Sequence, residues 1–171
     1  LTGLANRRAI LARFEEEAAR WSRTGTGLAL AVLDMDRFKE VNDTHGHLAG
    51  SRTLVEVGAV LEDTVRDADI LIRYGGDEFV ILFPETPLSG GMVIAERIRQ
   101  VIANTRFLES MGIEARVSAS IGIAAYPESA DDVRSLITSA DRAMYEAKAL
   151  GKNRVVAARP IAFPLALTEP T

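Results

Sequence analysis

The chain has 171 residues, of which 47% are apolar, and this is enough for one globular domain with a buried core. Its 20 basic and 24 acidic residues give a formal net charge of −4, so it lacks the basic surplus of a non-specific nucleic-acid-binding protein. It contains no cysteine, which excludes disulfides, thiolate zinc sites and cysteine nucleophiles and is typical of a reducing compartment. We therefore expect a cytoplasmic domain without nucleic-acid partners.

The amino-terminal part of the chain combines a helical pattern with a short apolar run. Apolar residues recur every three or four positions over residues 6–22, which predicts an amphipathic helix, and the Thr-Gly repeat at 24–27 ends it. The apolar run at 28–33 is short and closed by Asp34, as expected of a central strand that is buried on both faces. It is far shorter than the ~20 residues of a membrane helix, so we expect no membrane contact from this domain.

The remaining pattern changes repeatedly between helical spacing and short apolar runs. The paired glycines Gly75 and Gly76 can supply the positive φ angles of a two-residue turn, and they predict a hairpin. The expected elements are a helix over 38–44, a turn at 45–47, a helix over 48–65, hairpin strands 70–74 and 79–83, a helix over 91–104, a strand over 115–124, a helix over 131–149 and a strand over 154–157.

This order predicts an α/β domain, an α+β sandwich with a central mixed sheet of about five strands and surrounding helices. We assign residues 1–158 to that domain. Residues 159–171 contain three prolines and no periodicity, so we expect a linker or tail toward a downstream domain. The abrupt opening of the chain favours an excised domain of a longer protein.

Acidic residues lie where predicted strands end, with Asp34 and Asp36 after the first strand and Asp77 and Glu78 in the hairpin. Acids in a tight hairpin repel one another and are poor strand formers, a cost that a divalent cation removes. Mg²⁺ is commonly bound by one or two carboxylates plus substrate phosphates, so a magnesium site is predicted here. The alternative is that glycines make the turn and the acids only decorate it. We expect Asp36 to cap the next helix and to stay outside the metal shell.

The segment Gly75-Gly76-Asp77-Glu78-Phe79 is the signature for which the GGDEF family of diguanylate cyclases is named, and the chain resembles this family from residue 1 to about residue 156. Other blocks that match, in the family's order, are 1–8, 34–43, 45–47, 73–74, 120–124 and 140–148. The resemblance implies a fold similar to nucleotide cyclase and polymerase palm domains. It also implies a nucleotidyltransferase of bacterial second-messenger signalling that condenses two GTP into cyclic di-GMP and pyrophosphate.

The resemblance implies one GTP per subunit and catalysis in a homodimer. Asp34, the Met35 carbonyl, Asp77 and Glu78 would contact Mg²⁺, with Mn²⁺ as an alternative cofactor. Asp77 or a neighbour would help to deprotonate the ribose 3′-hydroxyl. Asp34, Asp77 and Glu78 are therefore the expected catalytic residues, and two metals would stabilise the charge at the α-phosphate.

The implied substrate-binding residues are Phe38, Lys39, Asn42, Ser51, Gly75, Gly76, Lys148 and Lys152. Amides at the start of the helix near Phe38 suit phosphates, and the glycines let the nucleotide approach the backbone closely. Lys148 and Lys152 match phosphate-binding positions, the second of which is often Arg in the family. Taken alone, two lysines at a helix end are more often partners of the helix dipole.

Ser51 departs from the family, which has an acid there to accept hydrogen bonds from the guanine edge beside the guanine-reading Asn42. A charged hydrogen bond contributes ~1.5–3 kcal/mol, so the loss lowers GTP affinity roughly 10- to 150-fold if Ser51 makes no replacement bond. Serine donates and accepts, so relaxed base choice is another outcome. The alternative is that Ser51 caps the following helix.

Arg66 and Asp69 match an Arg-x-x-Asp pattern that, in similar active members, binds the product cyclic di-GMP as an allosteric inhibitory site, with Arg97 as a secondary contact. An ordinary exposed ion pair is the alternative. The second functional hypothesis is a catalytically weak GTP- or cyclic di-GMP-binding regulatory domain attached to an EAL-type phosphodiesterase. A membrane anchor upstream in the full-length protein is compatible with either hypothesis.

Overall fold

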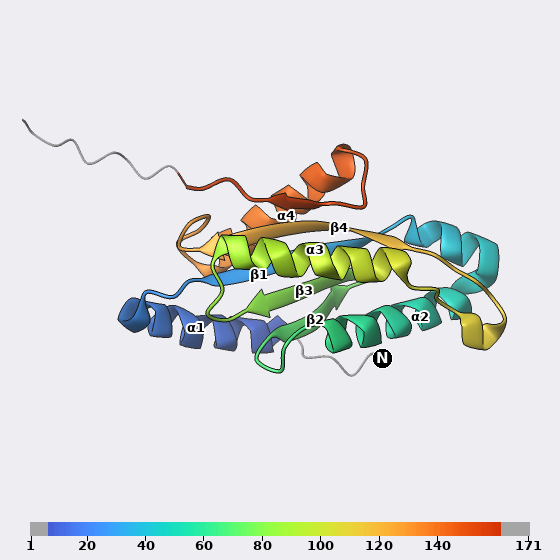
Figure 1. The fold of residues 1–171 in the computed structure, drawn as a ribbon, viewed down its shortest axis with the longest axis horizontal. Coiled ribbons are helices and arrows are strands. Elements are labelled where there is room, and N and C mark those ends of the chain that lie inside the picture. The colour runs from blue at the N-terminus through green and yellow to red at the C-terminus, as the bar shows by residue number, and fades with distance from the viewer. Residues whose placement is uncertain (1–6, 162–171) are drawn as a thin grey trace, which may run out of the picture.

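The structure is a computed structural model that describes residues 7–161, so the opening block up to residue 6 and most of the expected linker lie outside the described residues (Figure 1). Five strands form one sheet in the order β2-β3-β1-β4-β5. The strands are β1 Leu28–Asp36, β2 Ile70–Gly75, β3 Glu78–Phe83, β4 Ser118–Tyr126 and β5 Val155–Ala157. All neighbours are antiparallel except β4 and β5, which confirms the predicted mixed sheet.

Helices cover both faces of this sheet (Figure 1). They are α1 Arg7–Thr24, α2 Phe38–Thr64, α3 Leu88–Asn104 and α4 Val133–Ala149, with the short 3-10 turn η1 Glu109–Met111. Alternate residues of the fully buried β1 point to opposite faces. Ala31 and Leu33 therefore join a core with α2 and α3, whereas Leu30 and Val32 join a second core with α1 and α4.

The expected elements are present, with differences at their boundaries. α2 consists of two helical parts that meet at a kink with non-helical backbone at Gly46, so the predicted break over 45–47 is confirmed, although it is confined to one residue. α3 begins at Leu88, three residues before the expected start. The segment before β4 makes only an isolated bridge between Phe107 and Ala115, so β4 begins later than expected. Asp132 caps α4 in a reciprocal pair with Ser135.

The hairpin turn differs by one residue from the expectation. Gly75 ends β2 and pairs with Glu78, so the two-residue turn consists of Gly76 and Asp77. Only Gly76 has a positive φ, of 46°. Gly75 adopts strand backbone because the register shifts between Arg73 and Gly75, and this shift moves the turn toward the acids.

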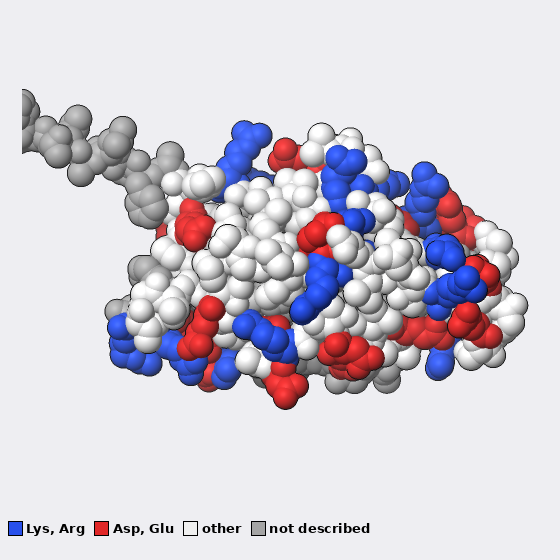
Figure 2. Space-filling model, viewed as in Figure 1, with Lys and Arg blue, Asp and Glu red and all other residues white. Residues whose placement is uncertain are grey.

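The surface agrees with the balanced composition. On the face shown in Figure 2, basic and acidic side chains are interspersed around a largely uncharged centre. No helix within residues 7–161 is long and apolar enough to cross a membrane.

Candidate functional site at the carboxyl end of β1

Strand pairing brings the predicted metal carboxylates together at one edge of the sheet. In the antiparallel register, Asp34 lies opposite Glu78 on one side and Ser120 on the other. The Met35 amide donates a hydrogen bond of 3.2 Å to the Asp77 carbonyl, which fixes the hairpin turn against the end of β1. The acids of two segments far apart in the sequence therefore meet, as the signature predicted.

The carboxylates at this edge of the sheet repel one another, so each makes ionisation of its neighbours less favourable. Burial raises the pKa of Asp34, which is 8% exposed, and the nearby charge of Asp77 raises it further, while Lys148 acts in the opposite direction. Burial also raises the pKa of Glu78, with additional contributions from Asp34 and Asp141. Negative charge is thus concentrated where the β1 strand ends.

Lys148 supplies the positive charge at this edge. It lies in the last turn of α4, and its Nζ is 2.8 Å from Asp34 Oδ1. Burial alone would lower the pKa of Lys148, but the hydrogen bond with Asp34 and the charge of Asp77 outweigh that effect and raise it. The lysine that was expected to hold a phosphate is therefore an ion-pair partner of the first expected metal ligand in this conformation.

The donor set fits a cation that is shared with a phosphate ligand. Within residues 7–161, no group of three or more histidines or acids is arranged to hold a metal ion by itself. Mg²⁺ rarely uses such closed cages, because it keeps several waters and binds one or two carboxylates together with substrate phosphates. Asp34 and Glu78, opposite each other and both with raised pKa values, offer those two carboxylates.

The crowding of charge leads to a pH-dependent prediction for Glu78→Gln. An acid whose pKa is raised on folding binds protons more readily in the folded state than in the unfolded state. The ionised Glu78 side chain therefore destabilises the metal-free fold at neutral pH. This destabilisation disappears as the pH falls through the raised pKa of Glu78. In EDTA at pH 7, Glu78→Gln is expected to have a higher Tm than the wild type, and the difference is expected to vanish near pH 4.

The control is Glu62→Gln on the exposed side of α2, which is expected to change neither value. Added Mg²⁺ is expected to raise the Tm of the wild type more than that of Glu78→Gln, because the cation removes the same repulsion. An unchanged or lower Tm for metal-free Glu78→Gln at pH 7 would refute the electrostatic account.

A cavity lies at one end of this site. It has a volume of about 550 Å³, and Arg37, Lys152 and Asn153 contribute to its lining. Arg37 precedes α2 in a left-handed conformation without a side-chain cap, so the first amides of the helix have no side-chain partner there. Lys152 is exposed and has a φ of 65°. Of the predicted substrate-binding residues, Lys152 alone lines this cavity, and the carboxylates of the hairpin do not.

The expectation that Asp36 caps α2 is wrong. Asp36 is 5% exposed and accepts hydrogen bonds from Ser118 Oγ at 2.7 Å, from Ser120 Oγ at 2.6 Å and from the backbone amide of Asn153 at 2.9 Å. The side chain points into the sheet edge because two hydroxyls of β4 converge there. Asp36 thus ties β1 and β4 to the turn that carries Lys152, and its charge also contributes to the raised pKa of Asp34.

The glycines of the hairpin turn are accessible, and the side chain of Arg73 holds the turn in place. A Cβ at Gly75 or Gly76 would meet no atom within 4 Å, so the backbone of the turn is accessible to a ligand. Arg73 Nε and Nη2 donate to the Gly76 carbonyl at 2.8 and 2.6 Å. Sequence reasoning gave no role to Arg73, although an arginine next to a glycine turn is a signal for such an anchor.

A second missed residue is Asp141, whose charge contributes to the raised pKa of Glu78. It lies about two helical turns before Lys148 on α4. The resemblance covered this segment, but no role was predicted for Asp141. The helix thus contributes a negative as well as a positive charge to this edge of the sheet.

The predicted base-reading residues lie on the two sides of the α2 kink. Asn42 is half-buried before Gly46, whereas Ser51 is exposed after it. Phe38 begins the helix and packs partly against the core, and the Lys39 side chain is exposed. Since Ser51 lies inside the helical part that follows the kink at Gly46, the alternative that it caps a following helix is wrong.

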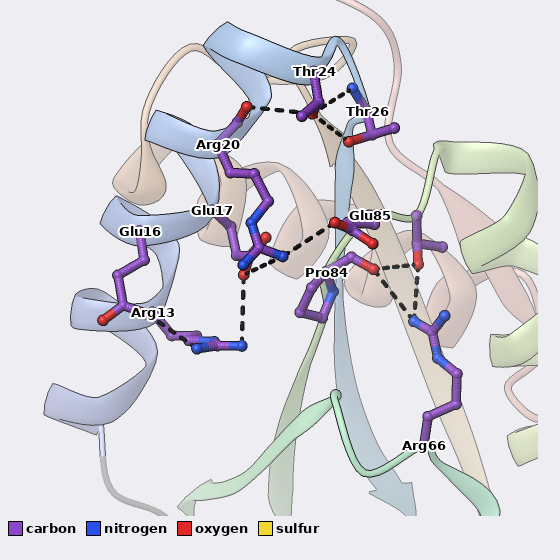
Figure 3. A network of polar contacts seen from close by, with 10 residues as sticks. Arg13, Glu16, Glu17, Arg20, Thr24, Thr26, Arg66, Pro84 and Glu85 are labelled. Carbon is purple, nitrogen blue, oxygen red and sulfur yellow. Dashed lines mark hydrogen bonds and ion pairs between the residues drawn. The ribbon is translucent and has the colours of Figure 1, made fainter.

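The predicted product site lies at the other end of β2. Arg66 donates from its amide to Asp69 Oδ2 at 2.8 Å and from Nη2 to Asp69 Oδ1 at 2.7 Å, and the Asp69 side chain is fully buried. Arg66 Nη2 also donates to Thr86 Oγ1 at 3.0 Å and to the Pro84 carbonyl at 3.3 Å (Figure 3). The guanidinium is thus held by the protein's own groups.

Neighbouring arginines complete this region. Arg97 Nη2 donates to the Thr64 carbonyl at 2.7 Å, which brings it to the end of α2 just before Arg66. From the other side, Arg20 of α1 contacts Glu85 at 3.1 Å, so α1 and Arg66 hold the same turn (Figure 3). The length of β2 separates Asp69 from the Gly75 end by roughly 20 Å. The structure therefore brings the predicted product-site residues together, at a distance from the predicted metal ligands.

Comparison with known proteins agrees with the motifs and the fold. The model of the diguanylate cyclase GGDEF domain matches residues 1–154. The chain is 43% identical over 155 residues to the diguanylate cyclase DgcP of Pseudomonas aeruginosa, covering 91% of this chain and 23% of DgcP. It spans between 23% and 35% of the length of DgcP and other curated relatives.

Solved structures show the same similarity. The GGDEF domain of YfiN (TpbB) from Pseudomonas aeruginosa has a TM-score of 0.87 and 35% identity, with 93% of this chain and 99% of that chain covered. The GGDEF domain of DgcB from Caulobacter crescentus, solved in complex with c-di-GMP, has a TM-score of 0.81 and 33% identity, with 90% and 91% covered. Diguanylate cyclases with GGDEF domains generally use divalent metals. By sequence, fold and the placement of its signature acids, the chain belongs to the GGDEF family of diguanylate cyclase domains.

Proposed function

We propose that this domain condenses two GTP molecules into cyclic di-GMP and two pyrophosphates. The observation that carries the proposal is the meeting of Asp34, Asp77 and Glu78 with Lys148 at the open end of β1, in a chain of the diguanylate cyclase family. This edge combines ligands for a hard cation with the positive charge of Lys148 and an accessible glycine turn.

Each half of the reaction joins the ribose 3′-oxygen of one GTP to the α-phosphorus of the other and breaks the bond to the pyrophosphate. Bound Mg²⁺, or Mn²⁺ in its place, would supply Lewis-acid stabilisation of the phosphoryl oxygens. Asp34, the Met35 carbonyl, Asp77 and Glu78 would hold the cation, and Asp77 or a neighbouring carboxylate would accept the 3′-hydroxyl proton. Asp34 is the most firmly placed of these groups, since β3 and β4 flank it on both sides.

The phosphate end is formed by three elements. The first amides of α2, near Phe38 and Lys39, have no side-chain cap and would bind phosphates beside the cavity that Arg37 and Lys152 line. With a cation bound by Asp34, the Lys148 ammonium would be free to contact the phosphates of the nucleotide. Asn42 and Ser51 on α2 would face the base, while Gly75 and Gly76 let the nucleotide approach the hairpin.

One GTP per domain requires two domains to face each other, so the reaction takes place in a homodimer. The test is to incubate purified protein with GTP and Mg²⁺ over a range of protein concentrations and to separate cyclic di-GMP from linear intermediates. Product formation that rises faster than linearly with protein supports the proposal. Constant specific activity at concentrations where light scattering shows monomers contradicts the dimer.

Ser51 favours a second candidate, a GTP- or cyclic di-GMP-binding regulatory domain with weak catalysis, attached to an EAL-type phosphodiesterase. Ser51 is exposed and carries no charge for the guanine edge. Absence of product under crowded conditions, together with measurable nucleotide binding, would favour this candidate over an active cyclase.

We also propose that Arg66, Asp69 and Arg97 bind the product at an inhibitory site. Arg66 is half exposed and offers a planar fork for a guanine edge or phosphate once it releases Thr86 and the Pro84 carbonyl. Because this site is separated from the catalytic edge by the length of β2, product bound there inhibits without occupying the GTP site.

Arg66→Lys is expected to weaken cyclic di-GMP binding about ten-fold and to relieve product inhibition, because lysine keeps the charge but loses the fork. Lysine also keeps a cation beside the buried Asp69 carboxylate, so the fold is retained better than in Arg66→Ala. Calorimetry measures the product affinity, and initial rates before product accumulates are expected to stay unchanged. The control is Arg106→Lys, an exposed arginine that contacts only Glu114 among the described acids. Equal product affinity in the wild type and Arg66→Lys would assign the pair to ordinary surface charge.

A further inference from the structure

Two segments of α2 that are eight residues apart come into contact across its kink. In a straight helix a separation of eight residues corresponds to about 12 Å, too far for direct side-chain packing. Gly46 breaks the helical course with a φ of 84° and a ψ of 165°, in the left-handed region that glycine adopts most readily. The bend brings Asn42, before the kink, against Gly50, after it.

The contact leaves no room for a side chain at Gly50. A Cβ there would overlap Asn42 Oδ1, lie 2.8 Å from Asn42 Cγ and come within 3.2 Å of Phe38 Cζ. Gly50 is buried and does not have the positive φ that distinguishes Gly46. The backbone therefore does not require glycine at this position, and the bare Cα serves to admit the Asn42 carboxamide.

This packing positions the carboxamide without using its hydrogen-bonding capacity. Among residues 7–161, the Asn42 side chain makes no hydrogen bond, and it is only half-buried. An amide has two N–H donors and a carbonyl acceptor, which complements a purine edge that also donates and accepts. The contact with Gly50 thus fixes the direction of Asn42 while its polar atoms stay available to a ligand.

We infer that Gly50 is a positioning residue for base selection: it holds Asn42 in the orientation that distinguishes guanine from adenine. The inference rests on the proposed function, in which Asn42 faces the base. Gly50 acts only through Asn42 and has no contact of its own with the nucleotide. Gly50→Ala displaces the carboxamide and removes the preference for guanine, while the carboxylates at the end of β1 and in the hairpin are unaffected.

The test uses 3′-deoxy-GTP and 3′-deoxy-ATP, which lack the attacking hydroxyl and therefore bind without reacting. Calorimetry in Mg²⁺ compares the wild type with Gly50→Ala. The expected result is a loss of roughly ten-fold in affinity for the guanine analogue, as for one or two neutral hydrogen bonds, with unchanged affinity for the adenine analogue. Gly90→Ala in α3 is the matched control, because its methyl meets only side-chain atoms of Thr86 and Pro87 and is expected to change neither affinity.

A double-mutant cycle with Asn42→Ala separates positioning from general damage. Asn42→Ala and Gly50→Ala are expected to lower guanine-analogue affinity equally, and the double variant no further. The double variant is also expected to have a higher Tm than Gly50→Ala, since it removes the overlapping atoms of Asn42. Additive losses of affinity, equal Tm values, or an unfolded double variant would overturn the inference.

The two proposals fail in different ways. Equal binding of both analogues by the wild type would show that Asn42 does not select the base, and would overturn the inference even if cyclic di-GMP were formed. A wild type that prefers the guanine analogue but makes no cyclic di-GMP would contradict the proposed turnover, while the cycle would still decide the role of Gly50.

Discussion

Asp34→Asn is expected to abolish turnover, with kcat lower by on the order of a thousand-fold or more. A metal ligand charge provides several kcal/mol of transition-state stabilisation, and each 1.4 kcal/mol corresponds to about ten-fold in rate. Asp34 is the acid that the sheet fixes most firmly, because Glu78 and Ser120 flank it in the strand register. The rate of cyclic di-GMP formation at saturating GTP and Mg²⁺ measures this effect.

The fold is expected to survive this substitution. Asparagine has the same shape, and burial already works against a charge at this position, as the raised pKa of Asp34 indicates. Lys148 loses its partner, but its side chain is 29% exposed and its Nζ also lies 5.7 Å from the centre of the Tyr145 ring. The control is Asp63→Asn on the exposed side of α2, with unchanged rate and Tm expected. Near-normal turnover of a folded Asp34→Asn variant would remove Asp34 from the mechanism.

The sequence predicted the sheet well because its strongest signals are local. The run over 28–33 has the length and apolarity of a central strand, and β1 is buried along its whole length. The hairpin was also expected, but its turn was placed one residue early. A Gly-Gly pair allows several registers, and pairing with β1, which places Glu78 opposite Asp34, determines which one forms.

The errors at the site have a common physical cause, namely contacts between distant segments. Asp36 was expected to cap the helix that follows it. Instead, its carboxylate accepts hydrogen bonds from two serine hydroxyls of β4 that are 82 and 84 residues away in the sequence. The ion pair of Lys148 with Asp34 likewise joins α4 to β1. Local patterns cannot predict such pairings, whereas the family signature could gather Asp34, Asp77 and Glu78 in one hypothesis.

Ser51→Asp is the second substitution with a large expected effect. The new carboxylate offers acceptors to the guanine edge, and a charged hydrogen bond contributes ~1.5–3 kcal/mol, so the KM for GTP is expected to fall by roughly 10- to 150-fold. Rejection of ATP is expected to improve, because its amino group and ring nitrogen do not present the same donors. Steady-state rates with GTP alone and with competing ATP measure both effects.

The position of Ser51 allows this charge at little cost in stability. Ser51 is exposed and lies inside the helical part that follows the kink at Gly46, so the carboxylate stays hydrated. The preceding residue, Gly50, packs against Asn42. This contact therefore joins the two parts of α2 that carry the predicted base-reading residues.

Ser51→Asn is the control that separates charge from shape, since its amide has a similar size and one acceptor but no charge. We expect it to recover little of the gain. The Mg²⁺ dependence is expected to be the same in all three proteins, because the carboxylates that would hold the cation lie at the hairpin and at the end of β1, and not on α2. If Ser51→Asp changes neither the KM for GTP nor the ratio of GTP to ATP turnover, then Ser51 does not face the base, and Asn42 reads guanine without a partner at this position.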